Sequence, residues 1–86
     1  MIYRVRLTST AEKERKQLPA PLRARIDSAI EELKTNPRPP GVVKLSGANN
    51  DWRMRVGDYR IIHEIDDSAK VVTVWRIAHR REVYRP

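Results

Sequence analysis

The spacing of apolar residues changes once along this chain, near Val42, and this change constrains the fold more than any other feature. Before it, apolar residues recur at helical spacing, at Leu22, Ile26, Ala29, Ile30 and Leu33. After it, apolar and polar residues alternate at every second position, as they do in half-buried strands. Helices followed by a run of strands predict an α+β domain.

The first half of the chain predicts one strand and a two-helix hairpin. Alternation over residues 2–7 indicates the strand, and the capping-box pattern Ser9–Glu12 indicates the start of a helix that ends near Leu18. Pro21 fits the first turn of a second helix. The proline-rich segment 37–41 should end that helix before the strands begin.

Four strands are expected in the second half, over residues 42–45, 52–56, 59–65 and 70–77. Turn residues separate them, and Gly57-Asp58 fits a two-residue hairpin turn with glycine first. The whole chain is therefore expected to form a single domain over residues 1–86. It should comprise an N-terminal strand, a two-helix hairpin and a mainly antiparallel four-stranded meander, with the helices packed on one sheet face.

Arginine dominates the charge of the chain. Lysine and arginine total 18 against 11 acidic residues, which gives a net charge of +7, and 13 of the 18 are arginine. A strongly basic small domain favours a polyanionic partner, although a basic surface also serves solubility alone. Guanidinium groups suit bidentate phosphate contacts better than lysine does. Local groups of arginine occur at Arg53, Arg55, Arg60, Arg76, Arg80, Arg81 and Arg85.

Strand alternation gathers some of these arginines on one face. Arg53 and Arg55 point away from the apolar side chains of their strand, and the following hairpin turn folds Arg60 back beside them. The longest strand brings Arg80 toward its end, where the tail adds Tyr84. Two interpretations stay open here: a concavity whose cations repel one another until an anion binds, or an ordinary solvated sheet face.

Several classes of site are excluded or disfavoured by composition. The chain has no cysteine, which excludes disulfides, thiolate zinc sites and cysteine nucleophiles and fits a reducing compartment such as the cytoplasm. Its apolar stretches are too short for a membrane span, and its start does not resemble a signal peptide. Two histidines with scattered acids match no metal-ligand spacing, so neither a metal nor a membrane partner is expected.

The strand region also carries recognisable motifs: KLSG at residues 44–47, WRMRVGDYRIIHEI at 52–65, VVTV at 71–74 and AHRREVY at 78–84. In this order and spacing they resemble the RelE/ParE toxins of bacterial toxin–antitoxin pairs. The basic cluster together with the late tyrosine is more similar to the RelE branch. The strand–helix–helix–strands order extends this resemblance over essentially the whole chain.

The resemblance implies a ribosome-dependent endoribonuclease that cuts messenger RNA through the 2′-hydroxyl, with no metal or cofactor. It also implies the partners: the ribosome and mRNA, a small acidic antitoxin, and operator DNA bound only through the antitoxin complex. A domain of charge +7 with exposed apolar strips suits an acidic, partly disordered chain that folds on binding. Two alternatives remain, a ParE-like inhibitor of DNA gyrase and a non-catalytic RNA- or ribosome-binding domain.

The resemblance also implies a set of functional residues. Arg53 and Arg55 match two basic residues on one strand, and Arg60 matches the arginine after an aromatic residue on the next strand. Tyr84 matches a late tyrosine that helps to place the nucleotide. The expected catalytic residues are Arg53, Arg55, Arg60, His79, Arg80 and Tyr84. The expected RNA-binding residues are Arg53, Arg55, Arg76, Arg81 and Arg85.

The general base is the point at which this chain departs from the family. Well-known RelE members carry lysines on the strand that holds Arg53 and Arg55 here, and arginine does not lose its proton because its pKa exceeds about 12. Cleavage then depends on electrostatics alone, with the 2′-hydroxyl acidified by surrounding cations, or on another group. The candidate bases, in order of preference, are His79, Glu64 and His63.

Overall fold

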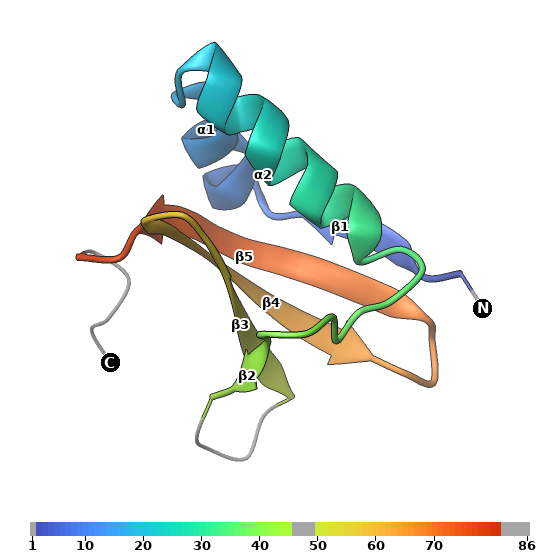
Figure 1. Cartoon of the computed structure of the whole chain (residues 1–86). Helices are drawn as coiled ribbons and strands as arrows, with labels where there is room; N and C mark the ends of the chain where they lie inside the picture. Colours follow the sequence, from blue (N-terminus) through green and yellow to red (C-terminus); the bar gives the residue numbers. More distant parts are fainter. Residues whose placement is uncertain (1, 46–49, 82–86) are drawn as a thin grey trace.

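The computed structural model describes residues 2–45 and 50–81. It contains two helices and five strands (Figure 1): β1 (Arg4–Leu7), α1 (Ser9–Lys16), α2 (Ala20–Glu32), β2 (Val43–Lys44), β3 (Asp51–Val56), β4 (Tyr59–Asp66) and β5 (Val71–His79). The order of these elements is the one that the sequence predicts, and each predicted strand is present within about two residues at its ends. The turn expected over residues 47–50 falls largely outside the described residues.

The five strands form one sheet in the order β1-β5-β4-β3-β2. Strands β2, β3, β4 and β5 pair antiparallel with one another in sequence, whereas β1 runs parallel to β5. Both helices lie on the same side of the sheet in Figure 1, above its upper face. The expected α+β fold with a mainly antiparallel sheet is confirmed. The one parallel pair follows from the helical crossover that carries the chain from β1 across the sheet.

The core lies between α2 and the helix-facing side of the sheet. Ile26, Ile30 and Leu33 face this core from α2 and the residue that follows it, as their helical spacing predicts. The sheet contributes Met54, Ile61, Ile65, Val72, Val74 and Ile77. Because side chains alternate along a strand, burying this set leaves the residues between them on the opposite face of the sheet, which no helix of the described part of the chain covers.

The start of α1 differs by one residue from the predicted capping box. The N-cap is Thr8, whose Oγ1 accepts a hydrogen bond from the backbone N–H of Ala11 at 3.1 Å. Thr8 leaves β1 in an extended conformation, and its hydroxyl also donates to the carbonyl of Trp75 at 3.1 Å. Placing Ser9 as the cap was wrong because this contact with β5 fixes which hydroxyl faces the helix end.

The β3–β4 hairpin has the predicted two-residue turn. Gly57 has a φ of 62°, a left-handed value that suits glycine, and Val56 pairs with Tyr59 on either side of the turn. The same register sets Arg55 directly opposite Arg60. The turn therefore fixes how the arginines of the two strands meet.

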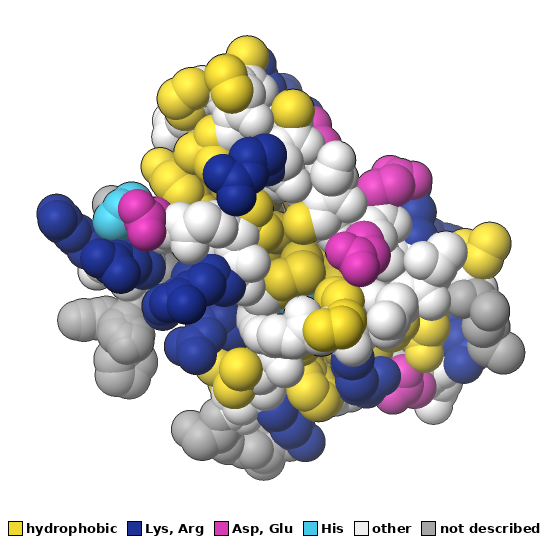
Figure 2. All heavy atoms as spheres, in the orientation of Figure 1, with side chains coloured by type: hydrophobic (Ala, Val, Ile, Leu, Met, Phe, Trp, Pro, Cys, Tyr) yellow, Lys and Arg dark blue, Asp and Glu magenta, His cyan; other side chains and the backbone are white. Residues whose placement is uncertain are grey.

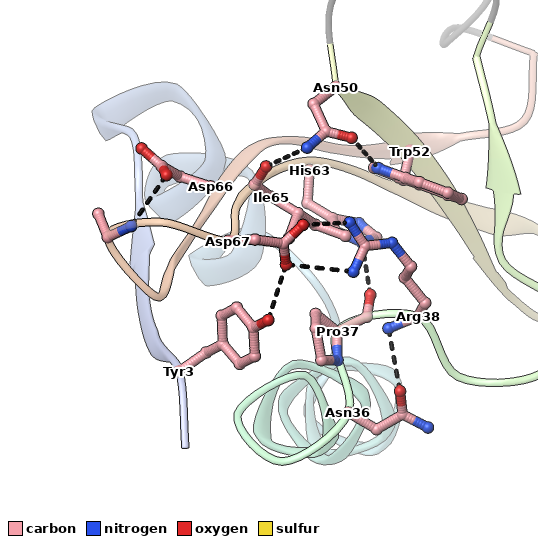
Figure 3. A network of polar contacts seen from close by, with 11 residues as sticks. Tyr3, Asn36, Pro37, Arg38, Asn50, Trp52, His63, Ile65, Asp66 and Asp67 are labelled. Atoms are coloured by element: carbon pink, nitrogen blue, oxygen red, sulfur yellow. Dashed lines mark hydrogen bonds and ion pairs between the residues drawn. The ribbon is translucent and has the colours of Figure 1, made fainter. Parts of the chain in front are cut away.

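A network of polar contacts ties the α2–β2 connection to the far end of the sheet (Figure 3). Arg38 donates to both carboxylate oxygens of Asp67, at 3.3 and 2.9 Å, and Asp67 also accepts from the Tyr3 hydroxyl at 2.7 Å. The Arg38 guanidinium lies 4.9 Å from the centre of the Trp52 ring. Below this layer, His63 Nε2 lies 3.3 Å from the carbonyl of Pro37. The network holds the segment that leads into β2 against the sheet.

Candidate functional site

Three arginines line a small hollow on the open face of the sheet. Its volume is ≈ 120 Å³, and its walls are formed by Gly41, Val43, Arg53, Arg55 and Arg60. Arg53 and Arg55 come from β3 and Arg60 from β4, while Gly41 precedes β2 and Val43 is its first residue. The register pairs Val43 with Arg53 and Arg55 with Arg60, so all of these side chains lie on one face. The predicted concavity is present for these three arginines.

The arginines of the hollow have no acidic partner among the residues that the structure describes. Over residues 2–45 and 50–81, no carboxylate forms an ion pair with Arg53, Arg55 or Arg60. Elsewhere the chain pairs its guanidiniums readily, as Arg15 does with Asp27 and Arg38 with Asp67. Three like charges held in one concavity repel one another, and a bound anion relieves that repulsion.

Basic side chains are visibly concentrated on this part of the molecule. Figure 2 shows Lys and Arg side chains gathered at the left, below the helices and toward the turn end of the β3–β4 hairpin, with few acidic side chains among them. This surface coincides with the end of the sheet where β3, β4 and β5 meet. The positive charge of this surface suits a polyanionic ligand.

His79 does not join the arginines. It pairs across the ladder with Tyr59, and its ring meets that tyrosine edge-on, with the two ring centres 5.5 Å apart. Both side chains lie on the helix-facing side, where His79 borders a separate hollow of ≈ 230 Å³ together with Glu14 and Gln17 of the α1 region. The prediction that His79 lies among the arginines is wrong. Ala78 pairs with Arg60, so alternation along β5 places His79, one residue later, on the opposite face of the sheet.

The other two candidate bases also lie away from the hollow. Glu64 is on the open face, but it lies four residues along β4 from Arg60, about 13 Å, and its Oε1 accepts from the Trp75 indole at 3.4 Å rather than from an arginine. His63 is fully buried on the core side, as its alternation with Ile61 predicts. Burial lowers the pKa of His63, because the charged imidazolium loses its hydration there.

The remaining predicted arginines are exposed or are engaged elsewhere. The Nε and a terminal nitrogen of Arg76 contact Glu14 Oε2 of α1, each at 2.8 Å, and the backbone N–H of Ile77 donates to Glu14 Oε1 at 2.7 Å. The backbone N–H of Arg80 donates to the Asp58 carbonyl at 2.7 Å, and the side chains of Arg80 and Arg81 are exposed. None of these three arginines lines the hollow.

Two predicted residues lie outside the described part of the chain: Tyr84, expected to place the nucleotide, and Arg85, expected to bind RNA. Conversely, Gly41 and Val43 line the hollow although they carry no chemical signal in the sequence. Glu14 is a further residue that the sequence did not single out, since its contacts with β5 cross more than 60 positions. No group of three or more His, Cys, Asp or Glu residues within the described ranges could hold a metal ion. No helix within them is long and apolar enough to span a bilayer.

Comparison with known proteins identifies the family of this chain. The family model for the ParE toxin of the type II toxin–antitoxin system parDE matches residues 5–84. The toxin RelG of Mycobacterium tuberculosis is 33% identical over 86 residues, covering 99% of each chain. The toxin RelE3 of Methanocaldococcus jannaschii is 32% identical over 85 residues, covering 94% of each.

Solved structures give the same result. The archaeal RelE–RelB complex from Pyrococcus horikoshii OT3 contains a chain that superposes with a TM-score of 0.84 at 28% identity, covering 96% of this chain and 100% of that one. The toxin–antitoxin complex RelBE2 from Mycobacterium tuberculosis gives 0.81 at 28% identity, with coverage of 93% and 100%. The chain therefore belongs to the RelE/ParE toxin superfamily of type II toxin–antitoxin systems, and the resemblance seen in the sequence is confirmed.

Proposed function

We propose that this protein is a ribosome-dependent endoribonuclease that cuts messenger RNA and so inhibits translation. The observation that carries the proposal is the hollow with three arginines that no acid of the described residues pairs. Such a hollow binds a phosphodiester at the group that a nuclease must attack. The relatives named RelE and RelG support the nuclease branch of the superfamily.

The chemistry assigned to the hollow is stabilisation of charge. Attack by the 2′-oxygen on the adjacent phosphorus breaks the bond to the 5′-oxygen and passes through a phosphorane with additional negative charge. Arg53, Arg55 and Arg60 together offer up to fifteen N–H donors and three permanent charges to that species (about five donors each). The same cations favour loss of the proton from the 2′-hydroxyl, because they stabilise the alkoxide more than the alcohol.

In this proposal the arginine cations acidify the 2′-hydroxyl, and no residue of the hollow acts as a general base. The five described residues that line the hollow include no group that accepts a proton near neutral pH. His79 borders the other side of the sheet and Glu64 lies about 13 Å along β4. We therefore assign Arg55 and Arg60 to charge stabilisation and propose that solvent or the ribosome-bound RNA receives the 2′-hydroxyl proton and supplies a proton to the leaving 5′-oxygen.

The first prediction tests the hollow directly. Arg60→Ala and Arg55→Ala should each lower the rate of mRNA cleavage on translating ribosomes by about 100-fold or more, as loss of a preorganised charge contact in a transition state does. Primer extension on transcripts from induced cells measures the cuts, and growth after induction measures toxicity. The matched control is Arg4→Ala, an exposed arginine of β1 on the same face, which lies two strands from β4 and three from β3. Full cleavage by both hollow variants would remove the basis of the proposal.

A second candidate function is inhibition of DNA gyrase, which the ParE family-model match over residues 5–84 favours. The two functions give different signatures in the same induced cells. Cuts within translated codons support the nuclease. A DNA-damage response without such cuts supports the gyrase inhibitor.

The proposed partners follow from the function and the charge. The structural relatives are complexes of RelE with RelB antitoxins, and a chain of +7 suits a short acidic antitoxin here as well. Ribosome and mRNA are the proposed targets, which makes the cytoplasm the proposed site of action. An acidic reading frame next to the gene is the expected genomic signature.

A further inference from the structure

Trp75 is an aromatic side chain that the fold leaves exposed on the open face of the sheet. It keeps 47% of its surface exposed, whereas Trp52 is partly covered by Arg38. A single exposed apolar residue is ordinary in a folded protein, so exposure alone assigns Trp75 no role. The local backbone and the contacts of the indole supply the further evidence.

A β-bulge sets the direction of this side chain. The register pairs Ile62 with Arg76 but His63 with Val74, so Trp75 is the extra residue of β5 at this point. Bulges re-aim side chains and are frequent beside active sites. The indole N–H contacts Oε1 of Glu64 at 3.4 Å, and Glu64 alternates with Arg60 on β4. The Trp75 ring is thereby held on the same face as the arginine hollow.

The position of Trp75 relative to the hollow suits a neighbouring nucleotide. Arg53 pairs with Ile62, and Ile62 pairs with the residue after Trp75, so one transverse row of the sheet leads from the hollow to the indole. Two strand spacings separate β3 from β5, about 10 Å. An RNA strand with a phosphate in the hollow therefore has an adjacent nucleotide within reach of Trp75.

The contact between Glu64 and the indole favours a base there rather than a phosphate. Glu64 contacts the indole, and Asp51 pairs with Glu64 across the ladder. Two carboxylates repel the RNA backbone, whereas the face of a nucleobase is uncharged and stacks on an aromatic ring. The cationic hollow and the Glu64 carboxylate that contacts Trp75 thus favour a phosphate position in the hollow and a base position at the indole.

We propose that Trp75 is a stacking platform for a nucleobase of single-stranded RNA whose phosphate occupies the arginine hollow. This inference rests on the proposed nuclease function and adds a second binding position to it. Every base presents a π-face, so the platform contributes affinity with little sequence preference. We assign this surface to RNA rather than to a protein, because the platform is continuous with the cationic hollow.

The test uses the purified toxin and a fluorescein-labelled hexanucleotide whose 2′-O-methyl groups prevent cleavage, with fluorescence anisotropy as the readout. Trp75→Ala should weaken binding about 5- to 150-fold, the range that loss of one stacked base gives. Trp75→Phe keeps an aromatic face and should restore most of the affinity. The matched control is Ile2→Ala, which removes another exposed apolar side chain that does not line the hollow and should change affinity less than twofold.

A second strand, identical but with abasic sites, isolates the stacking contribution. Wild type and Trp75→Ala should bind this strand with equal affinity. Three results would overturn the platform: undiminished binding of the full strand by Trp75→Ala, an equal loss on both strands, or no binding of the full strand by the wild type. Loss of antitoxin binding by Trp75→Ala with RNA binding intact would likewise overturn it and assign the surface to a protein. The cleavage assay with Arg60→Ala is independent, so the nuclease function can stand where the platform fails.

Discussion

At the scale of single residues, the fold keeps one histidine in an apolar setting and supports it with one hydrogen bond. His63 is fully buried, its Nε2 lies 3.3 Å from the Pro37 carbonyl, and its Nδ1 has no hydrogen-bond partner among the described residues. Burial disfavours the imidazolium, which lowers the pKa of His63 from its ordinary value of 6.5. The neutral form is therefore the one that the folded state accommodates.

This lowered pKa predicts a pH-dependent stability. The unfolded chain binds a proton at His63 more readily than the folded protein does. The stability that neutral His63 contributes should therefore be fully present above pH 6.5, and the free energy of unfolding should fall as the pH drops below 6.5 toward the folded pKa. Urea unfolding at pH 7 and pH 5 measures the change. His63→Gln should show a smaller fall, whereas His79→Gln, the matched control at the partly exposed histidine, should keep it. An equal fall in His63→Gln would contradict the assignment.

At the scale of the elements, helix α1 depends on contacts outside itself. Within its eight residues only Ala11 is buried, which leaves α1 with a thin apolar stripe. Its N-terminus is capped by Thr8 of the β1–α1 connection, and Glu14 near its C-terminus contacts the backbone and a side chain of β5. A short helix with so little buried surface is stabilised mainly by its ends and by tertiary contacts.

The cap gives a prediction that separates the observed N-terminus from the one expected from the capping-box pattern. Thr8→Ala should lower the free energy of unfolding by about 1 kcal/mol, because the N–H of Ala11 loses its acceptor. Ser9→Ala, one residue later and exposed, should change it by less than about 0.5 kcal/mol. Urea denaturation of both variants makes the comparison. A larger loss in Ser9→Ala would instead assign the N-cap to Ser9.

At the scale of the whole molecule, Glu14 joins the helical layer to the exposed edge of the sheet. Strand β1 pairs with residues 71–74, so among the described residues the later part of β5 has no strand neighbour on that side. The Glu14 carboxylate accepts from the N–H of Ile77 and from the Arg76 side chain at this place. It therefore satisfies a backbone donor of the edge and fixes α1 beside β5.

Removing this carboxylate should destabilise the protein more than removing an ordinary helix charge. Glu14→Ala leaves the Ile77 N–H and the Arg76 guanidinium without this acceptor, with an expected loss of about 1–3 kcal/mol in the free energy of unfolding. Glu12→Ala, the matched control on the same helix, breaks only its pair with Arg15 and should cost less than about 1 kcal/mol. Thermal or urea unfolding distinguishes them. Equal losses would show that the β5 contact contributes nothing.

The sequence by itself determined the order of the elements, the core face of α2 and the shared face of Arg53, Arg55 and Arg60. These are consequences of local periodicity and of one hairpin turn, so they need no knowledge of distant contacts. It also carried the family resemblance, because the motifs lie in the strands and their turns. Only the tertiary structure decided which hydroxyl caps α1 and on which side His79 lies.

The tertiary structure alone also decided that Gly41 and Val43 complete the hollow and that a bulge at Trp75 leaves its ring on the same face of the sheet. These features depend on strand register and on contacts between segments far apart in the chain. One residue of register exchanges the two faces of a strand, and the sequence of a strand does not state its partner's register. Register therefore separates what could be predicted from what had to be seen.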